Sequence, residues 1–144
     1  MSLTVDEIER YSRQIVLPEW GAAGQERVRG THVSVYGHGP AARTAILYLA
    51  GAGVMEIWGE PESCMDEVLA LNPNVLVVGG EDYLRIDDPS VAVRLEISEP
   101  TRCIEGVGDT EAVGAACAVE ALKAILGLPW RRSVALSAVD GQSR

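Results

Sequence analysis

The stretch Thr31–Gly53, THVSVYGHGPAARTAILYLAGAG, decides the fold of this 144-residue chain. Its first residues alternate apolar and polar side chains, as a half-buried strand does, and residues 41–50 form an apolar helical run. Between them lies the turn Gly37-His38-Gly39-Pro40. A strand, a glycine turn and a helix within about 20 residues form the first half of a βαβ unit. The sequence therefore predicts an α/β protein built around this unit.

The turn has the pattern G-x-G-x-x-A, which is close to the dinucleotide-binding fingerprint. Gly37 allows a sharp turn, Gly39 allows a phosphate to approach the backbone, and small Ala42 allows the helix to pack on the strand. The free N–H groups of the helix N-terminus attract an anion. Arg43 is favourable there only beside an anion, whereas Pro40 removes one donor. The alternative is a tight turn that binds nothing.

Composition narrows the classes of function. The formal charge is −9, from 12 basic and 21 acidic residues, and no basic tract is present. This argues against binding to nucleic acid or to an anionic membrane surface. No apolar run is long enough to span a membrane, and the N-terminus does not resemble a signal peptide. Cys64, Cys103 and Cys117 form no C-x-x-C pair, so we expect reduced thiols in a cytoplasmic protein.

The chain is expected to form a single domain, residues 1–144, with a helical arm (1–30) before a Rossmann-like core (31–139). We expect a reduced sheet of about five strands flanked by helices, with two helices before the first strand. The first three strands are expected to be parallel, and the last two to form an antiparallel edge. The expected strands are 33–36, 54–58, 75–78, 91–98 and 133–139; the expected helices are 5–16, 22–29, 41–50, 61–71 and 110–126.

Two details refine this expectation. Thr4 and Glu7 form a capping-box pattern at the first helix. Asp109 is expected to cap the helix that follows it, on which Glu120 is expected to be solvated. Leu69 is expected to face inward from the helix at 61–71, and a turn is expected to start at residues 140–141. The strand at 75–78 is entirely apolar, as in a sheet that is covered on both faces.

Residues 10–19, RYSRQIVLPE, are followed by Gly21 and by Gly24-Gln25-Glu26. This stretch resembles the opening motif R-Y-x-R-Q-I-x-L-P-E-x-G-x-x-G-Q-E of the ThiF/MoeB/HesA family, the bacterial relatives of ubiquitin-activating enzymes. The glycine turn follows at the family's spacing. Further similarity lies at residues 45–54, 71–75, 99–103 and 114–127.

The resemblance implies an adenylyltransferase that binds ATP and Mg²⁺ at the glycine turn and activates the C-terminal glycine of a ubiquitin-like sulfur-carrier protein. It also implies a homodimer in which Arg13 enters the ATP site of the partner. An arginine and Mg²⁺ would stabilise the negative charge that builds when a carboxylate attacks the α-phosphate. Without the family, Arg13 is interpreted as a helix-surface residue paired with Glu9.

Several reaction motifs of the family are missing. Trp58-Gly59-Glu60 stands where the family has D-x-D, so Glu60 either holds a ribose hydroxyl or is a solvated loop acid. The segments S-N-L-x-R-Q and D-x-x-D-N, with the lysine between them, have no match, and Lys123 lies too far along the chain. The zinc-binding cysteine pairs are reduced to Cys103, so we expect no zinc or other metal ligand set and an inert thiol. His38 either meets a phosphate or faces solvent.

Three hypotheses remain open. In the first, the chain is a degenerate, non-adenylating module that dimerises or binds a carrier protein. In the second, it is an active ATP-dependent adenylyltransferase; in the third, it is a dinucleotide-binding protein that uses Glu60 for the ribose. The candidate residues are catalytic Arg13, if the chain is active, and the cofactor-binding set Gly37, His38, Gly39, Arg43 and Glu60.

Overall fold

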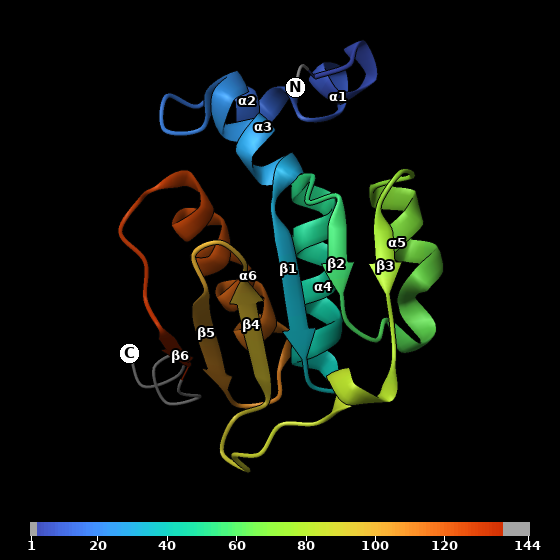
Figure 1. Cartoon of the computed structure of the whole chain (residues 1–144), viewed down its shortest axis with the longest axis vertical. Helices are drawn as coiled ribbons and strands as arrows, with labels where there is room; N and C mark the ends of the chain where they lie inside the picture. Colours follow the sequence, from blue (N-terminus) through green and yellow to red (C-terminus); the bar gives the residue numbers. More distant parts are fainter. Residues whose placement is uncertain (1–2, 137–144) are drawn as a thin grey trace, which may run out of the picture.

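The computed structural model describes residues 3–136 and shows one mixed sheet of six strands in the order β3-β2-β1-β4-β5-β6 (Figure 1). The expected Rossmann-like α/β fold is confirmed, with one strand more than the five expected. The strands are β1 (His32–Tyr36), β2 (Glu56–Trp58), β3 (Leu76–Val78), β4 (Val93–Ile97), β5 (Arg102–Val107) and β6 (Ser133–Ala135). The helices are α1 (Val5–Arg10), α2 (Ser12–Ile15), α3 (Gly21–Gly30), α4 (Pro40–Ala52), α5 (Met65–Leu71) and α6 (Glu111–Leu126), with 3₁₀ turns η1 (Glu62–Cys64) and η2 (Glu81–Leu84).

The two halves of the sheet differ in strand direction. Strands β1, β2 and β3 are parallel, as predicted, with His32 opposite Glu56 and Glu56 opposite Leu76. Strand β4 is antiparallel to both β1 and β5, so it lies inside the sheet and not at an edge. Strand β5 was not predicted, and it lies between β4 and β6, the last two predicted strands. The antiparallel direction of β4 is confirmed, but β4 and β6 do not pair to form the expected antiparallel edge.

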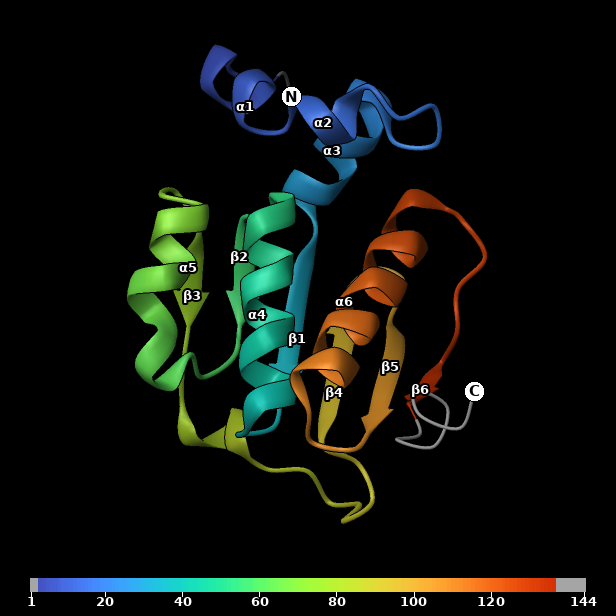
Figure 2. The same ribbon diagram turned by 180° about the vertical axis from the view of Figure 1, so that it is seen from behind.

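The long helices lie on one face of the sheet (Figure 2). Helices α4 and α6 pack together so closely that a Cβ at Gly114 would overlap the backbone carbonyl of Ala41. Residues 79–92, all of them described, connect β3 to β4 and contain only the short turn η2, so this link supplies no helix for the other face. The core therefore lies between the sheet and this single helical layer. Its fully buried side chains include Val33, Val35, Ile46, Leu49, Ile57, Leu95, Ile97 and Ile104.

The N-terminal arm contains three described helices, one more than predicted, because Tyr11 breaks the first one between α1 and α2. The capping box is confirmed: the Glu7 N–H donates to the Thr4 hydroxyl at 3.1 Å, and the Thr4 N–H donates to the Glu7 carboxylate at 2.9 Å. The arm lies at the end of the sheet where β1 begins, and the glycine turn lies at the other end (Figure 1). No helix of the described part has the length and apolar composition needed to cross a membrane.

Three further expectations are corrected. Strand β3 is an edge strand in which Leu76 is 56% exposed, and Leu69 is 39% exposed instead of facing inward. Glu120 is buried, because its carboxylate accepts from the Arg131 N–H at 2.8 Å and pairs with Lys123 at 3.0 Å. The last strand is described only as Ser133–Ala135. The remainder of that prediction, residues 137–139, and the turn at 140–141 lie outside the described residues.

Candidate functional site

The glycine turn is shaped by contacts within the chain. Gly37 has a φ of +128°, a conformation that side chains with a Cβ rarely adopt. Its N–H donates to the carbonyl of Tyr83 at 2.7 Å, and a Cβ there would lie 2.5 Å from the carbonyl oxygen of Ala92. The fold alone therefore requires glycine at this position, so Gly37 by itself is no evidence for a ligand.

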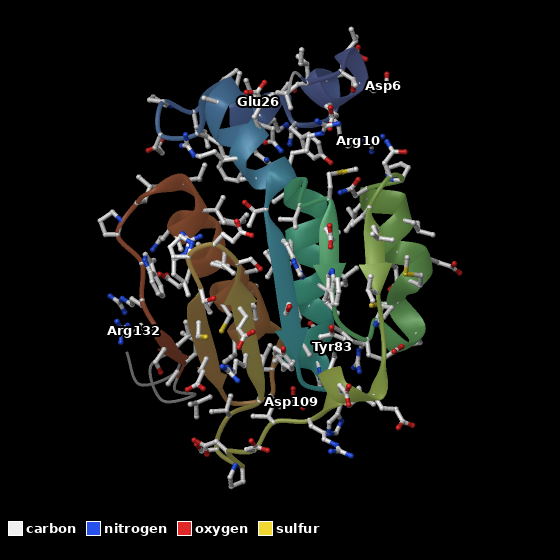
Figure 3. The ribbon with its side chains drawn as sticks, viewed as in Figure 1. Asp6, Arg10, Glu26, Tyr83, Asp109 and Arg132 are labelled. Atoms are coloured by element: carbon white, nitrogen blue, oxygen red, sulfur yellow. The ribbon has the colours of Figure 1, made fainter. Side chains whose placement is uncertain are left out.

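The helix after the turn already carries an anion. The N–H of Ala41, in the first turn of α4, donates to the Asp109 carboxylate at 3.0 Å. A Cβ on Gly39 would overlap that same carboxylate, so Asp109 lies directly against the turn (Figure 3). Helix N-termini attract negative charge, and Pro40 provides no N–H. The carboxylate of Asp109 thus takes part of the donor set that a phosphate would use.

Asp109 does not cap the helix that follows it, which corrects the prediction. The N-cap of α6 is Thr110, whose hydroxyl accepts from the Val113 N–H at 3.2 Å. Asp109 instead caps α4, a helix that begins far earlier in the chain. This pairing joins the ends of α4 and α6 that lie at the glycine turn.

The cleft beside the turn has a volume of about 540 Å³ and is bounded by Gly37, His38, residues 84–92 and Gly108-Asp109. Asp87, Asp88 and Asp109 bring negative charge to it, against Arg85 and His38. Hydrogen bonds from the backbone and hydroxyl of Ser90, at 2.9 and 2.7 Å, lower the pKa of Asp88, so this carboxylate stays ionised at neutral pH. The charge of the cleft does not favour a polyphosphate.

The remaining predicted residues are divided between the two ends of the sheet. Arg43 lies in the first turn of α4, and His38 lies exposed in the glycine turn. Glu60 follows β2 at the same end, but its carboxylate accepts from the Gly80 N–H at 3.1 Å and so holds the loop after β3. Arg13 lies exposed on α2, at the opposite end of the sheet. One chain therefore brings the glycine turn, Arg43 and Glu60 to one end of the sheet but leaves Arg13 far from it.

The N-terminal motif has a structural role that the sequence reasoning missed. Gln25 is fully buried, and its side-chain oxygen accepts from Gln14 and from the Trp20 indole N–H, both at 2.8 Å. Its amide nitrogen donates to the Ala52 carbonyl at the end of α4, at 2.9 Å. Tyr11 is also buried, close to the same end of α4. These residues of the N-terminal motif attach the arm to the core through buried hydrogen bonds. The two glutamines of the motif, Gln14 and Gln25, were the sequence signal that could have indicated this role.

The cysteines lie apart. Cys64 and Cys117 are buried, and burial together with the charge of Glu120 raises the pKa of Cys117 to about 12. Cys103 is half-buried, with its sulfur 3.5 Å from Arg94 Nη2 and 3.9 Å from the Glu96 carboxylate. Among residues 3–136, no group of three or more His, Cys, Asp or Glu side chains could hold a metal ion.

Comparison with known proteins places this geometry in a wider group. No model of a known protein family matches the chain. The chain is 28% identical over 166 aligned residues to the heterocyst and vegetative HesA proteins of Trichormus variabilis. These alignments cover 98% of the chain but only 58% of each HesA protein. The alignments, at 166 residues, are longer than this 144-residue chain. The HesA proteins therefore contain segments within the aligned region that have no counterpart here.

Shorter alignments give higher identity. The chain is 51% identical over 55 residues to the adenylyltransferase and sulfurtransferase MOCS3 of Anopheles gambiae, covering 38% of this chain and 12% of that protein. It is 42% identical over 53 residues to the probable adenylyltransferase/sulfurtransferase MoeZ of Mycobacterium tuberculosis, covering 37% and 14%. With the HesA similarity over almost the whole chain, these matches show that the chain is related to the ThiF/MoeB/HesA family.

Proposed function

We propose that this chain is a non-adenylating relative of the ThiF/MoeB/HesA proteins that acts as a dimerising or carrier-protein-binding module. The observation that carries the proposal is the hydrogen bond between the Ala41 N–H and the Asp109 carboxylate, 3.0 Å long, at the N-terminus of α4. An internal anion holds the position at which a nucleotide phosphate would be bound. In this proposal the glycine turn and the start of α4 serve to hold α4 against α6 and do not bind a nucleotide.

The size of the effect supports this proposal. A phosphate about 4 Å from the Asp109 carboxylate would be repelled by roughly 1 kcal/mol in water and roughly 4 kcal/mol near a protein surface. Each 1.4 kcal/mol weakens binding about tenfold. Asp87 and Asp88 add negative charge to the same cleft. The loss of the D-x-D motif, at Gly59-Glu60, removes ribose and metal contacts as well.

The N-terminal arm is the proposed dimerisation surface. Helices α1 and α2 bury none of their own residues, and apolar side chains of the arm are strongly exposed: Val5 by 73%, Ile8 by 49%, Val16 by 75% and Leu17 by 45%. A second copy of the chain would cover this apolar surface. The ubiquitin-like sulfur carrier remains a proposed partner on the strength of the resemblance, and the reduced cysteines suit a cytoplasmic location.

An active adenylyltransferase is the second candidate. It is favoured by Arg43, which lies in the first turn of α4, and by Glu60, which lies at the same end of the sheet. In that case ATP and Mg²⁺ would have to displace Asp109, and Arg13 would have to come from another copy. The dinucleotide-binding hypothesis has less support, because the Glu60 carboxylate is engaged by the Gly80 N–H.

Calorimetric titration with ATP and Mg²⁺ tests the proposal, with Asp109→Ala and the remote surface variant Asp66→Ala as a matched pair. We expect no binding to the wild type or to Asp66→Ala at millimolar ATP, and no pyrophosphate exchange with sulfur-carrier proteins. Binding that appears only in Asp109→Ala would identify the carboxylate as the block. Micromolar ATP binding by the wild type, or robust exchange, would overturn the proposal.

A further inference from the structure

The face of the sheet opposite the helices carries no described helix, as Figure 1 shows by looking directly onto it. Alternate residues of each strand point to this face because the side-chain period of a strand is two. In β1, for instance, Val33 and Val35 are buried beneath the helices, so Ser34 and Tyr36 lie on the other side. Sheets with parallel strands are normally covered on both faces. We call the uncovered side the bare face; it comprises His32, Ser34, Tyr36, Glu56, Trp58, Arg94, Glu96, Cys103 and Glu105.

Aromatic rings form a continuous cluster on the bare face. The rings of His32 and Trp58 lie 4.8 Å apart, and those of Trp58 and Tyr83 lie 6.4 Å apart in an edge-on arrangement. Tyr83, from η2, lies 5.4 Å from Tyr36, and the Arg94 guanidinium lies 5.7 Å from the Tyr36 ring centre. Tryptophan, tyrosine and arginine are the residues that most often dominate binding energy at protein interfaces.

These side chains are already held in place. The Trp58 indole N–H donates to the Glu56 carboxylate at 2.7 Å, and Arg94 pairs with the Glu96 carboxylate at 2.7 Å. Within each pair the two residues lie on the same strand, two positions apart: the first pair on β2 and the second on β4. Because these side chains are already ordered, binding a partner here costs less side-chain conformational entropy than binding to a surface of flexible side chains.

The charge of the bare face is negative. Among its described side chains, Glu56, Glu96 and Glu105 stand against the single guanidinium of Arg94, which Glu96 already neutralises. The formal charge of the whole chain is −9. A second copy of the chain and a nucleic acid would both meet repulsion here, whereas a positively charged partner would be attracted.

The geometry of the bare face favours a helix over a strand. Strands β1, β2, β4 and β5 each have neighbours on both sides, so their backbone groups are not open to an added strand. The distance from β2 to β5 is three strand spacings, or about 14 Å. A helix about 10–12 Å across, lying on the sheet as α4 and α6 do on the other side, covers most of that width.

We infer that the bare face is a docking surface for a basic amphipathic helix of another protein. Apolar side chains of that helix contact Trp58, Tyr36 and Tyr83, and its lysine or arginine residues pair with Glu105 and Glu56. Cations stacked on these half-buried aromatic rings add to the binding. This inference does not depend on whether the glycine turn binds a nucleotide.

The test uses a synthetic amphipathic helix of about 18 residues built from leucine and lysine, with a leucine–glutamate peptide of the same pattern as the control. We expect the lysine peptide to bind and the glutamate peptide not to bind. Trp58→Ala should weaken binding about tenfold or more, whereas Tyr48→Ala, at a 51% exposed tyrosine on α4, should leave binding unchanged. Glu105→Gln should weaken binding, and Glu67→Gln, which removes the same charge from α5, should not.

A measurement on the wild-type protein keeps the test decisive even if the Trp58→Ala variant does not fold. Cys64 and Cys117 are buried, so Cys103 is the thiol of this face that an alkylating reagent can reach. The lysine peptide should slow alkylation of Cys103 in the native protein. Equal weakening by Glu105→Gln and Glu67→Gln, or unprotected Cys103 in the bound protein, would show only general attraction to an acidic protein and overturn the inference. Self-association that Trp58→Ala abolishes would give the surface to a second copy and overturn it too.

Discussion

The carboxylate of Asp109 accepts a hydrogen bond from the backbone N–H of Ala41, 68 residues earlier in the chain, at 3.0 Å. It lies so close to Gly39 that a Cβ there would overlap it, and the carboxylate would have to move away to admit a side chain. One contact therefore accounts for the second glycine of the turn and for the joining of α4 to α6. A glycine pattern that usually indicates a ligand is explained here by a side chain of the protein itself.

Replacing Asp109 by alanine should lower the free energy of unfolding by about 1 kcal/mol, because an acceptor and a negative charge are removed from a helix N-terminus. Asp109→Asn should cost less, since its amide oxygen still accepts the Ala41 N–H. Urea denaturation followed by circular dichroism measures both. Equal stability of all three proteins would mean that the contact contributes nothing in solution.

Gly114→Ala should destabilise the protein although alanine is the better helix former. The added Cβ would overlap the backbone carbonyl of Ala41, which cannot move away as the end of a flexible side chain can. Overpacking of this kind costs about 1–3 kcal/mol, more than the roughly 1 kcal/mol gained in helix propensity.

Gly30→Ala is the matched control, since a Cβ at the end of α3 meets nothing within 4 Å. It should be neutral or stabilising in the same urea titration. If Gly114→Ala proved as stable as Gly30→Ala, the close packing of α4 on α6 would not exist in solution.

The sequence predicted the centre of the fold well because its signals there are local. The alternation at residues 33–36, the glycine turn and the apolar run that follows all act within one short stretch, and β1 and α4 appear where they were expected. Strand β5 was missed, although Ile104 and Gly106 alternate with Cys103 and Glu105 as a half-buried strand should. The family resemblance at residues 99–103 overlaps only the start of this strand and does not indicate a strand.

Contacts between distant residues could not be predicted from the sequence. Asp109 precedes α6 and has the right chemistry to cap it, so only the packing of α4 beside α6 shows that it caps another helix. The apolar run at 75–78 fits a strand buried on both faces, yet the strand order places Leu76 at an edge. Of the candidate site, the turn was predicted as a structure, but its internal anion was not.

Gln25→Leu should loosen the arm more than it unfolds the core. The change removes three hydrogen bonds made by residue 25, and the Trp20 indole N–H loses its acceptor, whereas the Gln14 amide still donates to the Ala52 carbonyl at 3.1 Å. A buried polar group without a partner costs about 1–3 kcal/mol. Hydrogen exchange followed by mass spectrometry should show faster exchange across residues 5–29 and little change in β1 and α4.

Gln14→Ala should produce a weaker form of the same effect, because Trp20 continues to donate to Gln25. Exchange that rose equally in the arm and in the sheet would show that the arm and the core unfold as one unit.

The buried thiol of Cys117 should make the protein less stable at alkaline pH. Burial and the charge of Glu120 raise its pKa to about 12 in the folded state, from an ordinary value near 9. Between these values the unfolded chain loses the proton while the folded chain keeps it, so the free energy of unfolding falls as the pH rises, by at most about 1.4 kcal/mol per pH unit. Because buried tyrosines also titrate in this range, the measurement is the difference from Cys117→Ala in urea titrations between pH 8 and about pH 11. That variant should lose less stability than the wild type as the pH rises, whereas parallel curves would mean that Cys117 ionises equally easily in both states.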